Sequence, residues 1–464
     1  MDWTESGFDS NLQRTPQLLE ATTDVTPLTS PTPFAAGLVS RSVNGGLEID
    51  MQNGHITRLG RRRREFQPNP TATVGSSSAN DFGDLQQAID AVYQDGGGNI
   101  ELDVGTIKPL SNLIPRNGVN VFGKGKDLSI IDFSNVLSFG DQAAVPFKGT
   151  LVHAFSLGNV TTGSNLLSAP LATFLGAGVT AGDSIYINGV VYRVQSVQDD
   201  THLIMTTSYR GASAANLFGE VVRPVRNCSW GRLTLQNGAA SGVLLQRVEN
   251  IDIEEVETVS FLGDRAFAGI KVTSAFNSIL SRNIAHNCQR GILIGDILYQ
   301  VPDKPAVGGG VNPVAIPITL FANQAYSNVA DGIRAELASQ MIMIANRATA
   351  NGQAGLFIRM CADSIINQNI ANYNTDGIRL YSYDGGLQQS IGGNLQDSNI
   401  QGNIANNNSN IGIRVRSSFG SNVASFPISY FVQRLNATGN TASNNGVQDI
   451  SVDSPNAAET VETS

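Results

Sequence analysis

Arginines and aromatic residues recur at fixed spacing in one stretch of this 464-residue chain. A guanidinium group binds a carboxylate or phosphate through two parallel hydrogen bonds, and an aromatic ring can stack on a sugar ring. The candidates for substrate binding are Arg334, Phe357, Arg359, Arg379, Arg414 and Arg416. This mixture predicts a surface that binds an acidic polysaccharide.

Carboxylic acids and a tyrosine lie among these arginines and could cleave a glycosidic bond. Hydrolysis needs two carboxyl groups roughly 5 to 9.5 Å apart, whereas elimination needs a base and a group that neutralises charge. The candidates for catalysis are Glu336, Asp384, Asp331, Asp376 and Tyr381. Asp331 and Asp376 each precede a glycine, where aspartate is an ordinary turn former, so a structural role stays open for both. For elimination, Tyr381 with Arg359 or Arg379 would serve.

The elements that must position these residues come from a repeated phrase that begins with asparagine. Its copies begin at Asn283, Asn323, Asn346, Asn369, Asn403 and Asn440. The steps from 323 to 346 and from 346 to 369 are each 23 residues long, and a fixed period of this length is typical of a solenoid. After the glycine of each copy, apolar residues alternate with other residues, as in Ile333, Ala335 and Leu337. Period two predicts a strand whose apolar side faces the core.

Stacking the copies about 4.8 Å apart turns corresponding positions into rows along the solenoid. An alanine row would fill the core: Ala285, Ala325, Ala348, Ala371, Ala405 and Ala442. An asparagine row predicts a ladder of amide hydrogen bonds: Asn328, Asn351, Asn374, Asn408 and Asn445. The arginines and aromatics fall in two neighbouring outward rows, which predicts one continuous strip. The alternative is a solvated face whose charges pair across rungs, as Glu336 and Arg359 could.

Longer steps in the repeat predict inserted loops. The insertions contain residues 296–317, 383–394 and 417–427. Each follows the arginine-bearing strand, so we expect the loops to wall one side of the strip, where functional residues tend to concentrate. His286 falls in a turn of its copy, which favours a structural role over a catalytic one.

The N-terminal half contains three further patterns. Residues 47–51 and 56–59 flank Asn53-Gly54, a strong hairpin signal. Residues 81–91 read as an amphipathic helix capped by Asp81, with an apolar face of Leu85, Ala88, Ile89 and Val92. Between 171 and 224, alternation through Asn188-Gly189 predicts a small antiparallel module. Arg61 to Arg64 form a charge run that is either a solvated linker or a contact with an acidic partner.

Whole-chain composition narrows the classes of function. The net charge of -9 argues against nucleic acid as the main partner. Of 30 basic residues 24 are arginines, which favours anion recognition over lysine chemistry. Cys228, Cys288 and Cys361 lack metal-ligand spacing and are expected to be buried. We expect no metal, no cofactor, no signal peptide and no membrane insertion.

Two stretches resemble known proteins. Phe82-Gly83-Asp84 in the helix, a strand at 99–104 and the Gly123-Lys124-Gly125 turn resemble the opening of the pectate-lyase-like superfamily. That resemblance implies an all-β fold, a right-handed single-stranded parallel β-helix capped by the N-terminal helix. The inserted module, with Gly182-Asp183-Ser184-Ile185 and later Asp199-Asp200-Thr201, is similar to modules of bacteriophage tail and tailspike proteins.

Taken together, these resemblances imply a bacteriophage tailspike, a homotrimer that is made in the host cytoplasm and carried on the virion. Its expected parts are a docking arm for other tail proteins (1–70), the cap and first rungs (71–163), the inserted module (164–224), the main β-helix (225–452) and an acidic tail (453–464).

The expected activity is depolymerisation of an acidic bacterial surface polysaccharide by a glycosidase or a lyase. The alternatives are a non-catalytic receptor-binding or structural virion protein and a stand-alone polysaccharide lyase. The calcium-binding acidic cluster of pectate lyases and the Asp-Pro-His triplet of alginate epimerases are not evident, which argues against both of those activities.

Overall fold

The computed structural model describes most of the chain from residue 77 onward and short strands before it. The described residues are 33–34, 38–43, 46–51, 55–58, 63–66, 77–102, 104–187, 190–264, 266–295, 314–315, 317–336, 338–359, 361, 363–381, 395–396, 398–416, 432–433 and 439–453. The chain divides into two units, Met1–Arg62 and Arg63–Ser464.

The first unit contains a four-stranded antiparallel sheet in the order β1-β2-β3-β4. Its strands are β1 (Pro33–Phe34), β2 (Leu38–Val43), β3 (Gly46–Met51) and β4 (His55–Arg58). β3 and β4 pair antiparallel, which confirms the predicted hairpin. The predicted arm extends to residue 70, but β5 (Arg63–Phe66) pairs with β6 and belongs to the second unit.

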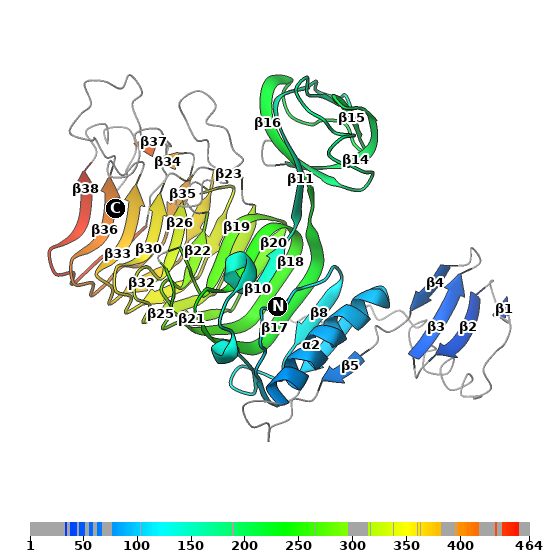
Figure 1. Ribbon diagram of the computed structural model, residues 1–464. Coiled ribbons are helices and arrows are strands. Elements are labelled where there is room, and N and C mark those ends of the chain that lie inside the picture. The colour runs from blue at the N-terminus through cyan, green and yellow to red at the C-terminus, as the bar shows by residue number, and fades with distance from the viewer. Residues whose placement is uncertain are drawn as a thin grey trace, which may run out of the picture. The chain divides into compact units, whose positions relative to one another are not determined.

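Parallel strands dominate the second unit, and each pairs with the equivalent strand of the next rung (Figure 1). The first rungs contain β6 (Gly98–Leu102), β7 (Gly105–Ile107), β8 (Val119–Phe122), β9 (Ser129–Asp132), β10 (Ala143–Lys148), β17 (Val225–Gly238) and β18 (Ser241–Phe261), with short 3-10 helices at Phe133–Asn135 and Gly140–Gln142. The later rungs contain β19 (Ile270–Phe276), β20 (Ser278–Ser281), β21 (Ile284–His286), β22 (Ile292–Ile294), β24 (Ile318–Phe321), β25 (Gln324–Tyr326), β26 (Ile333–Glu336), β28 (Ile342–Ile344), β29 (Arg347–Thr349), β30 (Ala354–Arg359), β31 (Ile365–Asn367), β32 (Ile370–Asn372), β33 (Asp376–Tyr381), β35 (Asn399–Gln401), β36 (Ile411–Arg416) and β38 (Gln448–Asp453). This is the stacked arrangement of a parallel β-helix.

Helix α2 (Ser77–Gln94) covers the first rungs, as expected for a solenoid cap. Leu85, Ile89 and Val92 are buried in the same apolar cluster as the strands beneath them. An amphipathic helix placed here shields the apolar core at the open end of the stack. The helix begins four residues before Asp81, so the prediction that Asp81 is the N-cap was wrong: Asp81 lies within the helix.

The inserted module is a closed antiparallel barrel in the order β11-β12-β15-β14-β13-β16. Its strands are β11 (Thr150–Val160), β12 (Leu166–Ser168), β13 (Ser184–Ile187), β14 (Val190–Asp199), β15 (His202–Met205) and β16 (Ala214–Arg223). It has an apolar core of its own. The barrel begins at Thr150 rather than 164, because β11 is needed to close it against β12 and β16.

The interior of the β-helix contains the predicted rows. The five alanines from Ala285 to Ala405 are fully buried, and Ala442 packs against the same core. Asn328, Asn351 and Asn374 bond amide to amide at 2.9 Å, which confirms the predicted ladder. A second ladder joins the asparagines at the start of each copy, with Asn346 Nδ2 donating to Asn369 Oδ1 at 3.0 Å.

The three cysteines lie inside the β-helix, and Cys288 occupies the position of a ladder asparagine, with its backbone N–H donating to Asn328 Oδ1. Cys288 Sγ contacts the carbonyl oxygens of Thr258 in the preceding rung and His286 two residues earlier. Cys228 and Cys361 make the same two kinds of contact. All three thiols are free and buried, and burial raises the pKa of Cys288 to about 12. No helix among the described residues is long and apolar enough to cross a membrane.

Candidate functional site

The predicted strip forms on consecutive rungs of β26, β30, β33 and β36. Arg334, Phe357, Arg379 and Arg414 lie opposite one another in one column. Glu336, Arg359, Tyr381 and Arg416 form the neighbouring column. These eight residues are called the strip below. Parallel pairing without a register shift along these strands brings them together, as the sequence period predicted.

Glu336 is the centre of a charge network on the strip. Its Oε1 accepts a hydrogen bond from Arg334 Nε at 2.7 Å and lies 2.9 Å from Arg359 Nη2. The Glu336 and Arg359 side chains are buried, so each charge would be unstable without the other. The cross-rung ion pair considered from sequence therefore exists, but its side chains are buried and not solvated.

Asp331 and Asp376 play matching roles in their rungs. Both are fully buried. Asp331 Oδ1 accepts from the backbone N–H of Ala354 in the next rung at 3.1 Å, and its Oδ2 accepts from Arg334 Nη1 at 2.8 Å. Asp376 likewise bonds to the backbone N–H of Ile411 and to the arginine three residues later. Each carboxylate joins two rungs and neutralises one arginine.

The aromatic residues of the strip are buried, contrary to the expectation that their faces are open to sugar rings. Phe357 is 4% exposed and Tyr381 8%. Their rings meet edge to face with centroids 5.4 Å apart, and the Arg334 guanidinium lies 4.4 Å above Phe357. Arginine and tyrosine thus occupy the surface of Phe357 that a sugar would need.

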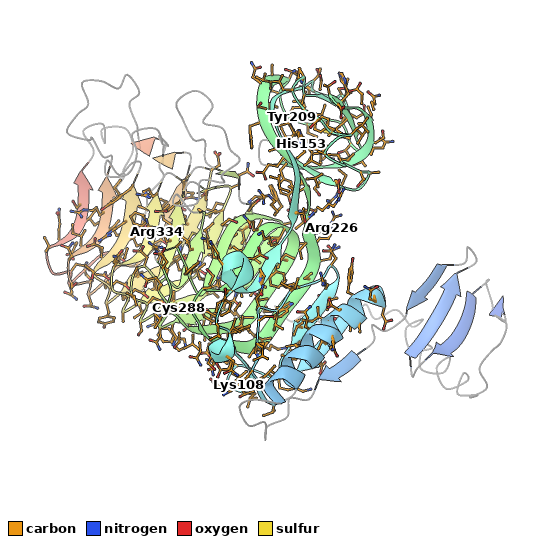
Figure 2. The ribbon with its side chains drawn as sticks, in the orientation of Figure 1. Lys108, His153, Tyr209, Arg226, Cys288 and Arg334 are labelled. Atoms are coloured by element: carbon orange, nitrogen blue, oxygen red, sulfur yellow. The ribbon has the colours of Figure 1, made fainter. Side chains whose placement is uncertain are left out.

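The more exposed groups of the strip are arginines. The Arg334 side chain is 16% exposed and that of Arg379 is 23%; Arg414 is half-buried. Figure 2 shows Arg334 on the later rungs of the β-helix. Burial works against its charge, but Glu336 and Asp331 outweigh that effect and raise the pKa of Arg334. Arg334 therefore carries a firmly held positive charge.

Arg290 extends the network by one rung and was not among the predicted site residues. Its Nε lies 3.8 Å from Asp331 Oδ2, and its side chain is buried. Arg290 precedes Gly291 just as Asp331 precedes Gly332, so the position before each glycine was the signal that could have found it. With Arg290 included, five described arginines face three carboxylates, an excess of positive charge on a chain of net charge -9.

Most residues of the predicted inserted loops lie outside the described residues, but short strand pairs lie beside them. β23 (Val314–Ala315) pairs with β27 (Ala338–Ser339), directly after β26. β34 (Leu395–Gln396) pairs with β37 (Val432–Gln433). β23, β34 and β37 lie beside the arrowheads of the strip strands (Figure 1). Asp384 and the Arg416 side chain lie outside the described residues.

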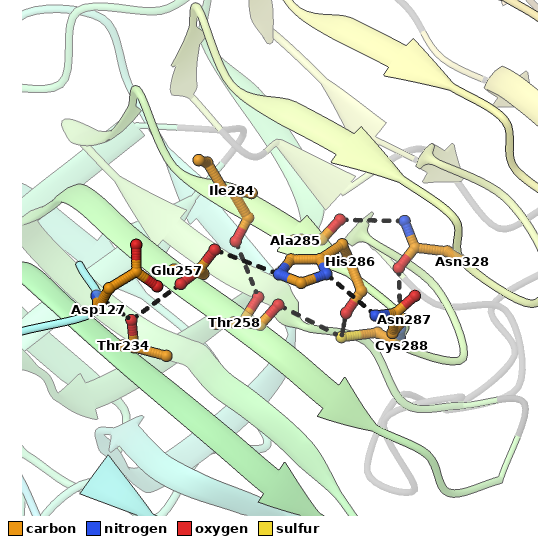
Figure 3. A network of polar contacts seen from close by, with 10 residues as sticks. All are labelled: Asp127, Thr234, Glu257, Thr258, Ile284, Ala285, His286, Asn287, Cys288 and Asn328. Carbon is orange, nitrogen blue, oxygen red and sulfur yellow. Dashed lines mark hydrogen bonds and ion pairs between the residues drawn. The ribbon is translucent and has the colours of Figure 1, made fainter. Parts of the chain in front are cut away.

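His286 belongs to a separate polar network on β21 (Figure 3). Its Nε2 lies 3.2 Å from Glu257 Oε1, and its ring stacks on Tyr326 with centroids 4.7 Å apart. Glu257 is held in turn by Thr234 Oγ1 at 2.9 Å. These contacts link successive rungs, which agrees with the structural role expected for His286.

The described part of the chain contains no group of three or more His, Cys, Asp or Glu side chains placed to hold a metal ion. On the strip, each described carboxylate is held by an arginine. The chemistry of the strip is therefore that of a cationic surface supported by buried ion pairs.

A family model described as "Right handed beta helix region" matches residues 221–387. No curated protein matches the chain. Among solved structures, the AlgE4 A-module of the mannuronan C-5 epimerase of Azotobacter vinelandii is 14% identical, with a TM-score of 0.40 over 82% of this chain and 96% of that one. The tailspike gp49 of Pseudomonas phage LKA1 is 12% identical, with a TM-score of 0.40 over 83% and 73%.

The tailspike Gp54 of Acinetobacter baumannii bacteriophage AP22, solved with a capsular saccharide, is 10% identical, with a TM-score of 0.38 over 81% and 70%. Likenesses at such low identity say nothing of activity. The match to the family model and the parallel pairing of successive rungs agree: the chain is built around a right-handed parallel β-helix.

Proposed function

We propose that this protein is a bacteriophage tailspike that binds an acidic bacterial surface polysaccharide along the strip. The observation that carries the proposal is the column of partly exposed arginines, Arg334, Arg379 and Arg414, on three of four successive rungs. A polymer with a carboxylate on successive sugars can bond to several guanidinium groups of such a column at once. The buried carboxylates orient these arginines without cancelling their total charge.

The virion assignment rests on the resemblance of the inserted module to phage tail modules. It includes a homotrimer whose residues 1–70 dock onto other tail proteins. A non-enzymatic receptor-binding spike would use the same arginine column, because binding needs no pair of catalytic carboxyls.

Cleavage is the second candidate function, and elimination suits the strip better than hydrolysis. A hydrolase needs one protonated carboxyl group as acid, whereas Glu336, Asp331 and Asp376 are each bonded to an arginine. In elimination an arginine neutralises the uronate carboxylate and a base removes the adjacent proton as the glycosidic oxygen leaves. Tyr381 is the candidate base, and it lies opposite Arg359 on the neighbouring strand of the strip.

A binding assay with purified acidic and neutral capsular polysaccharides tests the proposal. The Arg379→Gln/Arg414→Gln variant should bind the acidic polymer at least about tenfold more weakly, since a charge-assisted hydrogen bond contributes about 1.5–3 kcal/mol. Arg347→Gln is the matched control, because Arg347 is exposed on β29, away from the strip. Equal loss in the control, or equal binding of neutral polymers, contradicts the proposal.

Product analysis separates cutting from binding. Shorter oligosaccharides that absorb in the ultraviolet would identify an unsaturated product and hence elimination. If the bond is cut by hydrolysis, Glu336→Gln and Asp384→Asn should abolish product release while binding persists; if it is cut by elimination, Tyr381→Phe should do so. Unchanged release in the first two variants would remove Glu336 and Asp384 from the site.

A further inference from the structure

One row of polar side chains crosses four strands of the inserted barrel. Asn159 on β11 lies opposite Ser168 on β12, Ser168 lies opposite His202 on β15, and His202 lies opposite Asp199 on β14. Directly opposed residues of an antiparallel sheet place their side chains on the same face. The four side chains therefore share one face of the barrel, although they come from positions up to 43 residues apart.

Three members of the row form a continuous hydrogen-bonded chain. His202 Nε2 lies 3.3 Å from Ser168 Oγ. His202 Nδ1 lies 2.9 Å and 3.0 Å from the two carboxylate oxygens of Asp199. The Thr201 hydroxyl bonds to Asp199 Oδ1 and also contacts Nδ1, each at 2.9 Å. A nucleophile, a base and a carboxylate that orients the base are thus in the order that acyl transfer requires.

The carboxylate determines which ring nitrogen carries the proton. Bonds from His202 and Thr201 lower the pKa of Asp199 to about 2, so Asp199 is ionised at neutral pH. An ionised carboxylate only accepts hydrogen bonds, so the proton of a neutral imidazole lies on Nδ1. Nε2 is then free of a proton and can accept the one on Ser168 Oγ.

The barrel holds this row rigidly. Leu167 and Leu203, which precede and follow the row residues on β12 and β15, point inward and are fully buried. Ala169 N–H donates to the Thr201 carbonyl at 2.8 Å, which joins the ends of the two strands. Asn159 Nδ2 donates to Leu157 O at 3.2 Å, and an amide has a second N–H. Because Asn159 lies opposite Ser168 in the ladder, that second N–H is the candidate donor to an oxyanion beside Ser168, as in enzymes that use an asparagine for this purpose.

Ordinary turn chemistry accounts for only part of the arrangement. Asp199 Oδ1 accepts from Thr201 N–H at 2.7 Å, the usual bond of an aspartate turn. Such a turn needs neither a histidine beside it nor a serine opposite that histidine. The turn alone therefore does not account for the contact between Ser168 and His202.

We propose that Asn159, Ser168, His202 and Asp199 form an esterase site that removes O-acyl groups from a polymer. Ser168 Oγ attacks the acyl carbon and its proton passes to His202 Nε2. The sugar hydroxyl leaves with that proton, which gives an acyl-serine. Water then attacks the acyl carbon, again through His202, and releases the free acid. Water is the only co-reactant.

The openness of the site favours a polymer as substrate. The His202 side chain is 37% exposed, so the row faces solvent and not a closed cavity. An acyl group on a polysaccharide can reach such a surface, and the polymer itself excludes part of the water. The site shares no residue with the strip, so the esterase proposal does not depend on the function proposed above.

A fluorophosphonate probe with peptide mass spectrometry tests the nucleophile in the full-length chain. In the expected result Ser168 Oγ forms a bond to phosphorus, fluoride leaves, and the label maps to the peptide containing Ser168. Ser168→Ala should lose the label, and His202→Gln should slow labelling at least about 100-fold, the usual contribution of a general base. Ser196→Ala is the control, because Ser196 is an exposed serine on the strand that carries Asp199.

Release of acetate from an O-acetylated polysaccharide and hydrolysis of para-nitrophenyl acetate test the activity. Both should fall at least about 100-fold in Ser168→Ala and stay unchanged in Ser196→Ala, with melting curves that match the wild type. Absence of label on wild-type Ser168 overturns the proposal, as does hydrolysis that Ser168→Ala leaves unchanged. Acetate release is measured separately from polysaccharide binding. A lack of esterase activity would therefore not contradict the proposal that the strip binds a polysaccharide.

Discussion

The asparagine ladders and the strip are both polar rows that run along the β-helix, yet they differ in how their groups are satisfied. In the ladders, each rung supplies the same residue, so one amide donates to the next by simple repetition. In the strip, opposite charges from different rungs neutralise one another, as Glu336 does with Arg334 and Arg359. Repetition of one residue indicates structure, whereas a departure from repetition within the same column indicates a specialised role.

Removing one ladder amide should be the most damaging change in this comparison. In Asn351→Ala, Asn328 loses its acceptor for both its backbone and side-chain N–H groups. Two buried donors left unbonded, together with the small cavity, should lower the free energy of unfolding by about 3–5 kcal/mol. Thermal and denaturant unfolding measure the loss. Arg347→Ala in the same rung is exposed and should change stability little; an equal loss there would contradict the role assigned to the ladder.

Glu336→Gln should destabilise the protein less, by about 2–3 kcal/mol. The amide keeps the size of the side chain, and Asp331 still neutralises Arg334. The freed positive charge should strengthen binding of an acidic polysaccharide, and calorimetry at two salt concentrations checks this. Stability that is unchanged, together with binding that is weaker, would show that Glu336 contacts the ligand itself.

Cys288 offers a way to lengthen a ladder. Its backbone N–H already donates to Asn328 Oδ1 at 3.0 Å, and its thiol contacts the Thr258 carbonyl. Cys288→Asn should therefore keep or raise the melting temperature, whereas Cys288→Ala should lose about 1–2 kcal/mol. If the melting temperature of Cys288→Asn falls as much as that of Cys288→Ala, the ladder cannot extend into this rung.

The same cysteine predicts a dependence on alkaline pH. Burial raises its pKa to about 12 in the folded protein, whereas an unfolded thiol titrates near 8.5. Its contribution to stability is present below pH about 8.5 and is lost as the pH rises toward 12. Comparing melting temperatures of wild type and Cys288→Asn across this range should show a smaller alkaline decrease in the variant. If the melting temperatures of the two proteins decrease equally with pH, groups other than Cys288 cause the decrease.

A backbone change at a ladder turn should have the smallest effect. Ala345 precedes a ladder asparagine with a φ of 58°, where the equivalent position of a later rung is Gly402 with a φ of 61°. Left-handed backbone costs an alanine roughly 1–2 kcal/mol, so Ala345→Gly should raise stability by under about 1 kcal/mol after the entropy of glycine is counted. The buried Ala348→Gly should instead be destabilising. The melting temperature should rise in Ala345→Gly and fall in Ala348→Gly; a fall in both would contradict this prediction.

Much of the fold follows from sequence because a solenoid repeats one local rule. The asparagine and alanine positions predict the rungs, the core and one ladder, and period two predicts the register of the strip. Asp81 and the start of the barrel were misplaced because helix and strand boundaries depend on what packs against them. The second ladder and Arg290 were overlooked, although both lie at fixed positions of the repeat.

For the candidate sites, the sequence by itself determined which residues share a column, since equal spacing and a parallel stack leave no other register. Only the tertiary structure decided which of them reach solvent. Phe357 and Tyr381 are buried because neighbouring rungs bring arginine and aromatic side chains into contact above the sheet. The Ser168, His202 and Asp199 row likewise depends on antiparallel pairing across three strands, and no single period in the chain encodes that pairing.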